Sequence, residues 1–285
     1  MKNYLDYVER IAETFAEGSQ IAPGDQPGVF EMLKCPQTQK TSPLNVLVFA
    51  PHPDDECIIG LLPLRLMAEC GAKITDVAVT LGSNKARQQE RKAELQSACK
   101  YLNWDLKICG FENVRLPNRE NAGSRWNEYV EELSCLIKRE NPDAIFAPNF
   151  NDWNATHIGT ARLVADAAER ARYGGVVFQT EYWGGLKEGN LMVEASPRYI
   201  AAQMKALSLH TKEVERNDYH LRLPAWMSDS VRRGAELVGG QGAAAPRFDF
   251  ATLYNAVRFR EGKWEQIYTS KFLKITDRAD EALHS

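Results

Sequence analysis

A histidine and two aspartates stand together in the segment PHPDDE, residues 51–56. A neutral imidazole and a carboxylate are common zinc ligands, and a second carboxylate beside them can carry protons. The segment directly follows residues 46–50, which are all apolar and have the length of a strand. The prolines on both sides of His52 cannot continue a sheet ladder and restrict their neighbours, which predicts a rigid turn at the end of a buried strand. His52, Asp54 and Asp55 are therefore candidate site residues.

His157, one of five histidines, has a similar position in the sequence. It follows a second predicted strand, residues 143–148, and opens a predicted helix. Taken alone, it is more simply interpreted as a helix-start residue bonded to the backbone. In an open parallel sheet, however, ligands bind in the crevice at the carboxyl ends of the strands, so His52 and His157 can converge there. Two imidazoles with Asp55 make a common catalytic zinc set, which leaves one coordination position open.

Strands and helices alternate from residue 45 onward, which is typical of a parallel sheet covered on both faces. The right-handed crossover rule then favours a Rossmann-like, doubly wound α/β fold with a mostly parallel sheet. No glycine-rich dinucleotide fingerprint follows the first strand, which disfavours a nicotinamide enzyme. The predicted strands are 45–50, 74–80, 106–109, 143–148 and 176–181, and the predicted helices are 57–71, 86–102, 126–140 and 157–172.

Three regions are expected within a single domain. Residues 1–44 form an N-terminal helix and an irregular lead-in, and residues 45–185 form the Rossmann-like catalytic core. Residues 186–285 form a C-terminal α+β elaboration that completes the substrate site. This last region is expected to contain a strand at 191–195, helices at 197–216 and 228–238, strands within 252–270, and a loose polar tail after 276.

Bulk properties exclude several classes of protein. A net charge of −3 without a cluster of basic residues gives no reason to expect nucleic acid as a partner. No apolar run approaches the roughly 20 residues of a membrane span, and the N-terminus has no apolar core of a signal peptide. Six cysteines without a CxxC pair are typical of reduced thiols. We therefore expect a cytoplasmic protein.

The segment Ala50–Glu56 resembles the signature of the PIG-L (LmbE-like) family of zinc-dependent N-acetylglucosamine deacetylases. Residues 79–83, followed by Arg91 at the family's helix spacing, are a second similar region, and His157 is a third. A weaker fourth is 205–207 with His210 downstream. The resemblance covers roughly residues 45–212 and implies a Rossmann-like hydrolase that can form homo-oligomers.

The resemblance also implies roles for individual residues. His52, Asp55 and His157 would bind Zn²⁺, although a His-His-Asp set also accepts Fe(II), Co(II) or Ni(II). Asp54 would be the general base that takes a proton from the metal-bound water and then returns one to the departing amine. Glu56 would hold the loop by hydrogen bonds.

The second metal region departs from the family pattern. Many relatives have His-x-Asp-His there, and the first histidine of that motif helps to stabilise the oxyanion. The matching position in this chain is Asn154. Asn154 can donate a hydrogen bond to an oxyanion but cannot carry a charge, and it is the second candidate catalytic residue. Asp152 would orient His157, although caps at the start of a helix explain Asp152 and Asn154 equally well.

Two residues are candidate substrate contacts. The resemblance implies that Arg91 contacts sugar hydroxyls or phosphate, whereas composition alone explains it as part of a solvated charged helix face. Trp183 follows the last core strand and can stack on a sugar ring, although aromatic residues at strand ends also pack at rims.

We therefore expect an enzyme that removes an N-acyl group from a small amino sugar or sugar conjugate, and the resemblance implies that this group is acetyl. Two alternatives stay open. The Asn154 and Thr156 departures are compatible with a metal- and ligand-binding member of the fold that has lost catalysis. The same zinc set would also serve an esterase or phosphoester hydrolase.

Overall fold

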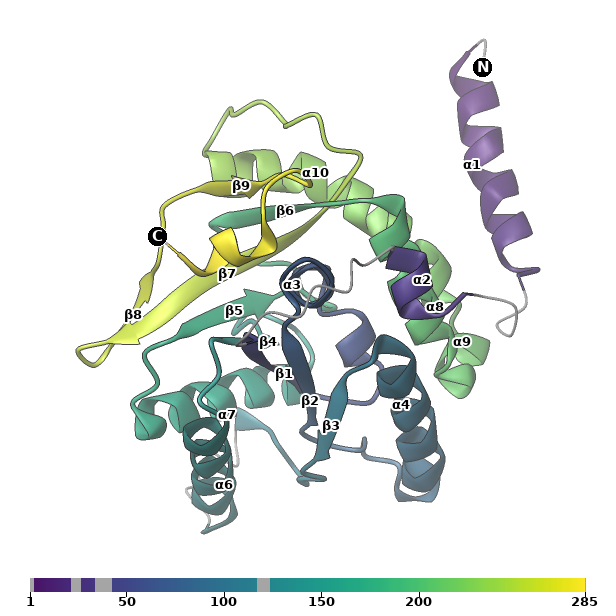
Figure 1. The fold of residues 1–285 in the computed structure, drawn as a ribbon. Coiled ribbons are helices and arrows are strands. Elements are labelled where there is room, and N and C mark those ends of the chain that lie inside the picture. The colour runs from purple at the N-terminus through teal and green to yellow at the C-terminus, as the bar shows by residue number, and fades with distance from the viewer. Residues whose placement is uncertain (1–2, 22–26, 34–42, 117–123, 285) are drawn as a thin grey trace.

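Nine strands form one sheet in this computed structural model, which describes residues 3–21, 27–33, 43–116 and 124–284. The strands are β1 (Asn45–Ala50), β2 (Lys73–Ala78), β3 (Asp105–Ile108), β4 (Ala144–Pro148), β5 (Val176–Thr180), β6 (Leu191–Ala195), β7 (Phe250–Arg260), β8 (Lys263–Gln266) and β9 (Lys271–Leu273). Their order is β3-β2-β1-β4-β5-β7-β6-β9, with β8 paired to β7 (Figure 1). β1 to β5 are all parallel, which confirms the Rossmann-like, mostly parallel sheet.

Helices cover both faces of this sheet. The longer helices are α1 (Tyr4–Gly18), α3 (Leu62–Cys70), α4 (Gln88–Leu102), α6 (Ser124–Glu140), α7 (Ala155–Ala171), α8 (Pro197–Ser208) and α10 (Leu223–Gly239), and the shorter ones are α2 (Val29–Leu33) and α9 (Thr211–Arg216). Val48 lies in the apolar core that α3 and α8 cover, and its neighbour Phe49 lies in the core beneath α6 and α7. Alternate side chains of β1 therefore enter opposite cores, as in a doubly wound fold.

The chain changes direction across the sheet at β1. From there it proceeds outward through β2 and β3, then returns to place β4 and β5 on the other side of β1. The carboxyl ends of β1 and β4 are thus neighbours at the switch point, where crevices form in open α/β sheets. His52 follows β1, and His157 lies in the first turn of α7, the helix after β4.

The C-terminal residues continue the same sheet. β7 is antiparallel to both β5 and β6, and β9 is parallel to β6. α10 packs on this extension through Val231 and Val238, which share a core with Met192 and Leu253.

Three predictions about elements need correction. The predicted helix 57–71 begins only at Leu62, because Gly60 has φ +94° and a Cβ there would lie 2.2 Å from the Tyr254 hydroxyl. The predicted helix 197–216 is divided into α8 and α9 at His210. The tail is not loose: residues 279–283 form a 3₁₀ helix in which Ala279, Ala282 and Leu283 are buried.

The N-terminal region has a different character. α1 has no buried residue and stands away from the sheet (Figure 1). Most of the predicted irregular lead-in lies outside the described residues. No helix in the described ranges has the length and apolar character that a membrane crossing requires.

Candidate metal centre and active site

The loop after β1 places His52 and Asp55 beside each other. The Thr80 hydroxyl donates to Pro51 O at 2.8 Å and fixes the start of the loop. The His52 amide then donates to Asp55 Oδ2 at 2.9 Å, and the Asp55 amide donates to His52 O at 3.2 Å. A 3₁₀ turn, Asp55–Cys57, follows. These reciprocal bonds hold both side chains at the mouth of the strand.

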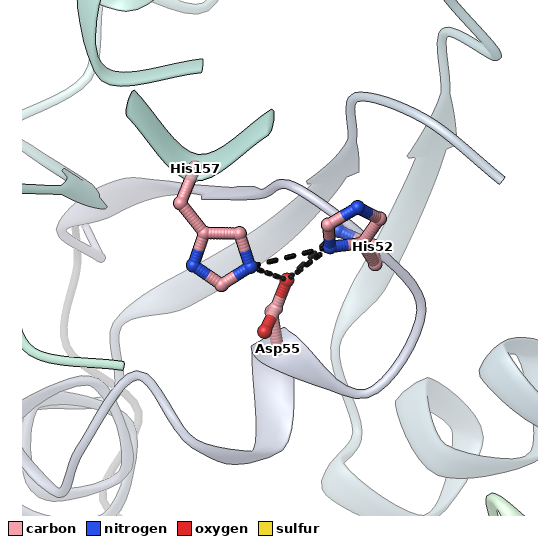
Figure 2. A group of neighbouring side chains, drawn as sticks. All are labelled: His52, Asp55 and His157. Atoms are coloured by element: carbon pink, nitrogen blue, oxygen red, sulfur yellow. Dashed lines mark hydrogen bonds and ion pairs between the residues drawn. The ribbon is translucent and has the colours of Figure 1, made fainter. Parts of the chain in front are cut away.

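His157 completes a triangle of possible ligand atoms with this loop (Figure 2). His52 Nδ1, His157 Nε2 and Asp55 Oδ2 lie 3.2 Å from one another along all three edges. Two ligands of a tetrahedral zinc ion, with bonds of about 2.0–2.1 Å, are about 3.3 Å apart. The three atoms are therefore spaced like one face of a zinc coordination tetrahedron.

The electrostatics of the triangle favour a cation. Burial alone would lower the pKa of His157, but the carboxylates of Asp55 and Asp152 outweigh burial and raise it to about 10. Burial would raise the pKa of Asp55, but the charge of His157 and hydrogen bonds from both histidines hold it well below its usual range. The geometry, the donor types and this charge preference all fit a divalent metal ion.

Asp152 supports His157 from behind. Its Oδ2 lies 3.5 Å from His157 Nδ1 and also accepts the Gly184 amide at 3.1 Å. Its Oδ1 accepts the Asn154 amide at 2.8 Å. A carboxylate at the second imidazole nitrogen orients the ring and selects the tautomer that leaves Nε2 to a metal.

Asp54 is buried beside the triangle in an unusual backbone conformation. Its φ is +112°, a region that non-glycine residues rarely adopt. The Glu56 carboxylate holds it there by accepting the Asp54 amide at 2.8 Å. The Tyr219 hydroxyl donates to Asp54 Oδ2 at 2.6 Å. Burial and the charge of Asp55 raise the pKa of Asp54 to about 7, although two nearby cations and the tyrosine bond oppose the shift.

Glu56 connects this loop to the C-terminal half of the core. Its Oε1 lies 2.6 Å from His210 Nε2, and Cys57 Sγ donates to the same oxygen at 3.1 Å. Glu56 and His210 are both fully buried. The contacts are those of a residue that holds the loop by hydrogen bonds.

Asn154 caps the start of α7 and lines a pocket beside His52. Its Oδ1 accepts the Thr156 amide at 2.9 Å and the His157 amide at 3.4 Å. The cap uses the side-chain oxygen, so the Nδ2 hydrogens are available to another acceptor. The pocket has a volume of about 390 Å³ and a largely polar lining that includes Gly82 and Gln88.

Arg91 contacts the metal loop, which is the segment after β1 that carries His52 and Asp55. Its Nη2 donates to Pro53 O at 2.7 Å and lies 3.7 Å from Asp54 Oδ1. Gly82, at φ +83°, makes room for this side chain, because a Cβ there would lie 2.6 Å from Arg91 Nη1. Glu213 Oε1 lies 3.8 Å from Arg91 Nε. Arg91 therefore packs against the loop that carries the candidate site, although it is not among the residues that line the pocket beside His52.

Trp183 lies in the loop after β5, with 39% of its surface exposed. The preceding residue, Tyr182, packs edge-on against the His157 ring at 4.9 Å. The structure thus brings Trp183 near the metal triangle through its neighbour.

Tyr219 is the functional candidate that sequence reasoning did not identify. It lies 165 residues from Asp54 and belongs to no recognisable motif. Only the packing of the short 3₁₀ segment Tyr219–Arg222 against the core brings it to the carboxylate.

Several known proteins share this fold. Teicoplanin deacetylase Orf2, in a zinc-inhibited form, matches with a TM-score of 0.56 and 13% identity over 76% of this chain and 99% of its own. N,N'-diacetylchitobiose deacetylase from Pyrococcus horikoshii matches with a TM-score of 0.53 and 17% identity over 80% and 89%. GalB, the 4-carboxy-2-hydroxymuconate hydratase from Pseudomonas putida KT2440, matches with a TM-score of 0.52 and 15% identity over 77% and 98%.

Sequence comparison finds one family that is similar to part of the chain. No curated protein sequence matches the chain significantly. Residues 47–168, however, match the family model described as PIG-L: GlcNAc-PI de-N-acetylase. This range contains the metal triangle and Asp54. Over these residues the chain is therefore similar to the PIG-L family.

Proposed function

We propose that this protein is a metal-dependent hydrolase that removes an N-acyl group, acetyl in the simplest case, from an amino sugar or sugar conjugate. The observation that carries the proposal is the 3.2 Å triangle of His52, Asp55 and His157. A buried carboxylate stands beside it in a PIG-L domain. The deacetylases among the proteins of similar fold support the same reaction class.

His52, Asp55 and His157 would hold the metal, and Zn²⁺ is the ion we propose. A divalent ion bound there would supply Lewis-acid chemistry, lowering the pKa of a bound water and polarising the acyl carbonyl. Asp152 would keep His157 oriented while the ion is bound.

Asp54 is the proposed general base. Its pKa, raised to about 7, lies where a carboxylate can both accept and return a proton near neutral pH. It would take the proton from the attacking water on Oδ1 or Oδ2 and deliver it to the departing amine nitrogen. The Tyr219 hydroxyl at 2.6 Å would keep the carboxylate aimed during both transfers.

The remaining site residues would bind and stabilise the substrate. Asn154 would donate an Nδ2 hydrogen to the oxygen that becomes negative in the transition state. Arg91 would present its guanidinium to a sugar hydroxyl while it holds Pro53 O. Trp183 would offer its exposed ring to the sugar face.

Release of primary amine tests the proposal. Purified protein reconstituted with Zn²⁺ should deacetylate N-acetylglucosamine or one of its conjugates, and a chelator should abolish the release. Parallel assays with acetyl esters and phosphoesters test the esterase alternative. Amine release that is indifferent to chelator would contradict the metal-dependent mechanism.

A hydratase is the second candidate. GalB, the 4-carboxy-2-hydroxymuconate hydratase, has a similar fold. A metal triangle with a neighbouring base can serve either reaction. Loss of the absorbance of 4-carboxy-2-hydroxymuconate on incubation with the protein, in a preparation that releases no amine from N-acetyl sugars, would identify the hydratase.

The strained Asp54 favours catalysis over a protein that only binds a ligand. A residue at φ +112°, held by Glu56 and Tyr219, costs about 1–3 kcal/mol of backbone strain. A binding protein needs no such base. We further propose a cytoplasmic enzyme that acts on a small molecule, and a homo-oligomer is compatible with this role.

A further inference from the structure

We infer that Trp153 and Trp183 form a subsite for a second ring, joined to the N-acylated sugar that enters the active site. This inference rests on the proposed function and deepens it. It defines the substrate class as conjugates in which the sugar carries a ring, either another sugar or an aryl group, in place of a free monosaccharide.

The two indoles are unusually exposed for their size. Trp153 has 72% of its surface accessible and Trp183 has 39%. Tryptophan is normally well buried, and single exposed apolar residues need no explanation. Here two indoles stand side by side, with ring centroids 6.4 Å apart and planes tilted by 45°. Together they form an apolar patch beside a polar pocket.

The patch is fixed before any ligand arrives. Trp153 Nε1 donates to Trp183 O at 3.0 Å, which ties the loops after β4 and β5 together. Asn149 Nδ2 donates to Gly184 O at 3.2 Å, and Asp152 Oδ2 accepts the Gly184 amide. A Cβ at Gly184 would lie 2.7 Å from Asp152 Cα, so only glycine permits this contact.

A partly buried ion pair anchors the other side of the loop after β5, which carries Trp183. Arg233 of α10 donates from Nη1 to Glu181 Oε1 at 2.8 Å and from Nη2 to Glu181 Oε2 at 2.7 Å. Glu181 Oε1 also accepts the Leu186 amide at 2.8 Å. Because the aromatic rings are positioned in advance, stacking a ligand on them costs little conformational entropy.

The patch leads directly to the proposed base. The Trp183 ring lies 5.6 Å from the Tyr219 ring, and the Tyr219 hydroxyl bonds to Asp54. The aromatic residues therefore form a row from the carboxylate outward, first Tyr219, then Trp183, then Trp153. A substrate with its acyl group at Asp54 would extend its next ring over the indoles.

The chemistry of the two areas differs in the way that such a conjugate requires. The pocket beside His52 presents Gln88 and Asn154, which can bond to the hydroxyls of the acylated sugar. The Trp153 indole N–H is engaged by Trp183 O, so the exposed part of Trp153 is apolar. The flat C–H face of a pyranose or an aryl ring suits that surface.

Substrate comparison tests the inference. We would measure kcat/KM for N-acetylglucosamine, its phenyl glycoside and N,N'-diacetylchitobiose. Trp153→Ala should lower the ratio of conjugate to monosaccharide kcat/KM by about 3- to 10-fold, the range expected for one aromatic stack. Trp153→Phe should restore most of the ratio, because it keeps an aromatic face. Phe30→Ala, which removes an exposed aromatic residue from α2, is the matched control and should leave the ratio unchanged.

The outcomes separate the inference from the proposed function. A reduced ratio for the phenyl glycoside alone assigns an aryl ring, and a reduced ratio for chitobiose assigns a sugar. If amine is released but Trp153→Ala leaves both ratios unchanged, the inference is wrong and the function stands. If no compound is hydrolysed, the function fails, and calorimetric binding of the same ligands decides the subsite. Equal affinities of wild type and Trp153→Ala for these ligands would then overturn the inferred subsite.

Discussion

The Glu56 carboxylate and the His210 imidazole meet at 2.6 Å, although 154 residues separate them in the chain. Both side chains are fully buried. The other oxygen of Glu56 holds the Asp54 amide. A contact between α8–α9 and the metal loop therefore determines where the proposed base stands.

Replacing His210 with alanine should destabilise the protein by about 3–5 kcal/mol, because Glu56 would remain buried without its charged partner. Urea unfolding with a fluorescence readout measures this. His284→Ala, which removes an exposed histidine, is the control and should change the free energy of unfolding little. An unchanged midpoint for His210→Ala would show that the pair carries no net stabilisation.

Asp54→Asn should lower kcat by about 10²- to 10⁴-fold while metal content stays near wild type, since an amide cannot accept the proton. Elemental analysis and amine release on the same preparation measure both quantities. Asp55→Asn provides the contrast, because it removes a proposed ligand and should lose metal as well as activity. Full activity of Asp54→Asn would refute the assignment of the base.

Tyr219→Phe should move the acidic limb of the pH–rate profile to higher pH. The tyrosine hydrogen bond lowers the pKa of Asp54, so its removal raises that pKa further, and the base becomes deprotonated only at higher pH. The measurement is kcat/KM against pH. Tyr101→Phe is the control, since the buried Tyr101 hydroxyl has no hydrogen-bond partner among the described residues. A shift to lower pH would contradict the proposed role of the bond.

Metal affinity should rise with pH by about tenfold per unit below pH 10. The pKa of His157 is raised to about 10, so a divalent ion must displace its proton at neutral pH. In the metal-free protein, this proton contributes stability that is complete below pH 6.5 and lost as pH rises through 10. Calorimetric titration of Zn²⁺ in buffers of different ionisation enthalpy should report one released proton. A titration that releases no proton would contradict the displacement of the His157 proton by the metal ion.

The fold and the core of the site could be predicted because local sequence determines them. The apolar run before His52 and the start of the helix at His157 place both residues at strand ends, and the parallel sheet then brings those ends together. The roles of Tyr219 and His210 could not be predicted, because their contacts depend on how distant segments pack. The break at Gly60 was missed for the same reason, since the Tyr254 hydroxyl that occupies the space comes from β7. The burial of Ala279 likewise depends on its amide bond to Glu69 on α3, 210 residues away.

The position of β7 between β5 and β6 has a consequence for how the family-matching region can be isolated. β5 forms backbone bonds to β4 on one side and to β7 on the other. A fragment that ended soon after β5 would lack β7, so one edge of the buried strand β5 would expose unpaired backbone amides and carbonyls. Such an exposed edge promotes aggregation. The region that matches the family model ends at residue 168, within α7, so β5, which pairs with β4, and β7, which pairs with β5, both come from sequence beyond the match. We therefore expect the whole sheet, and not the matching region alone, to fold independently.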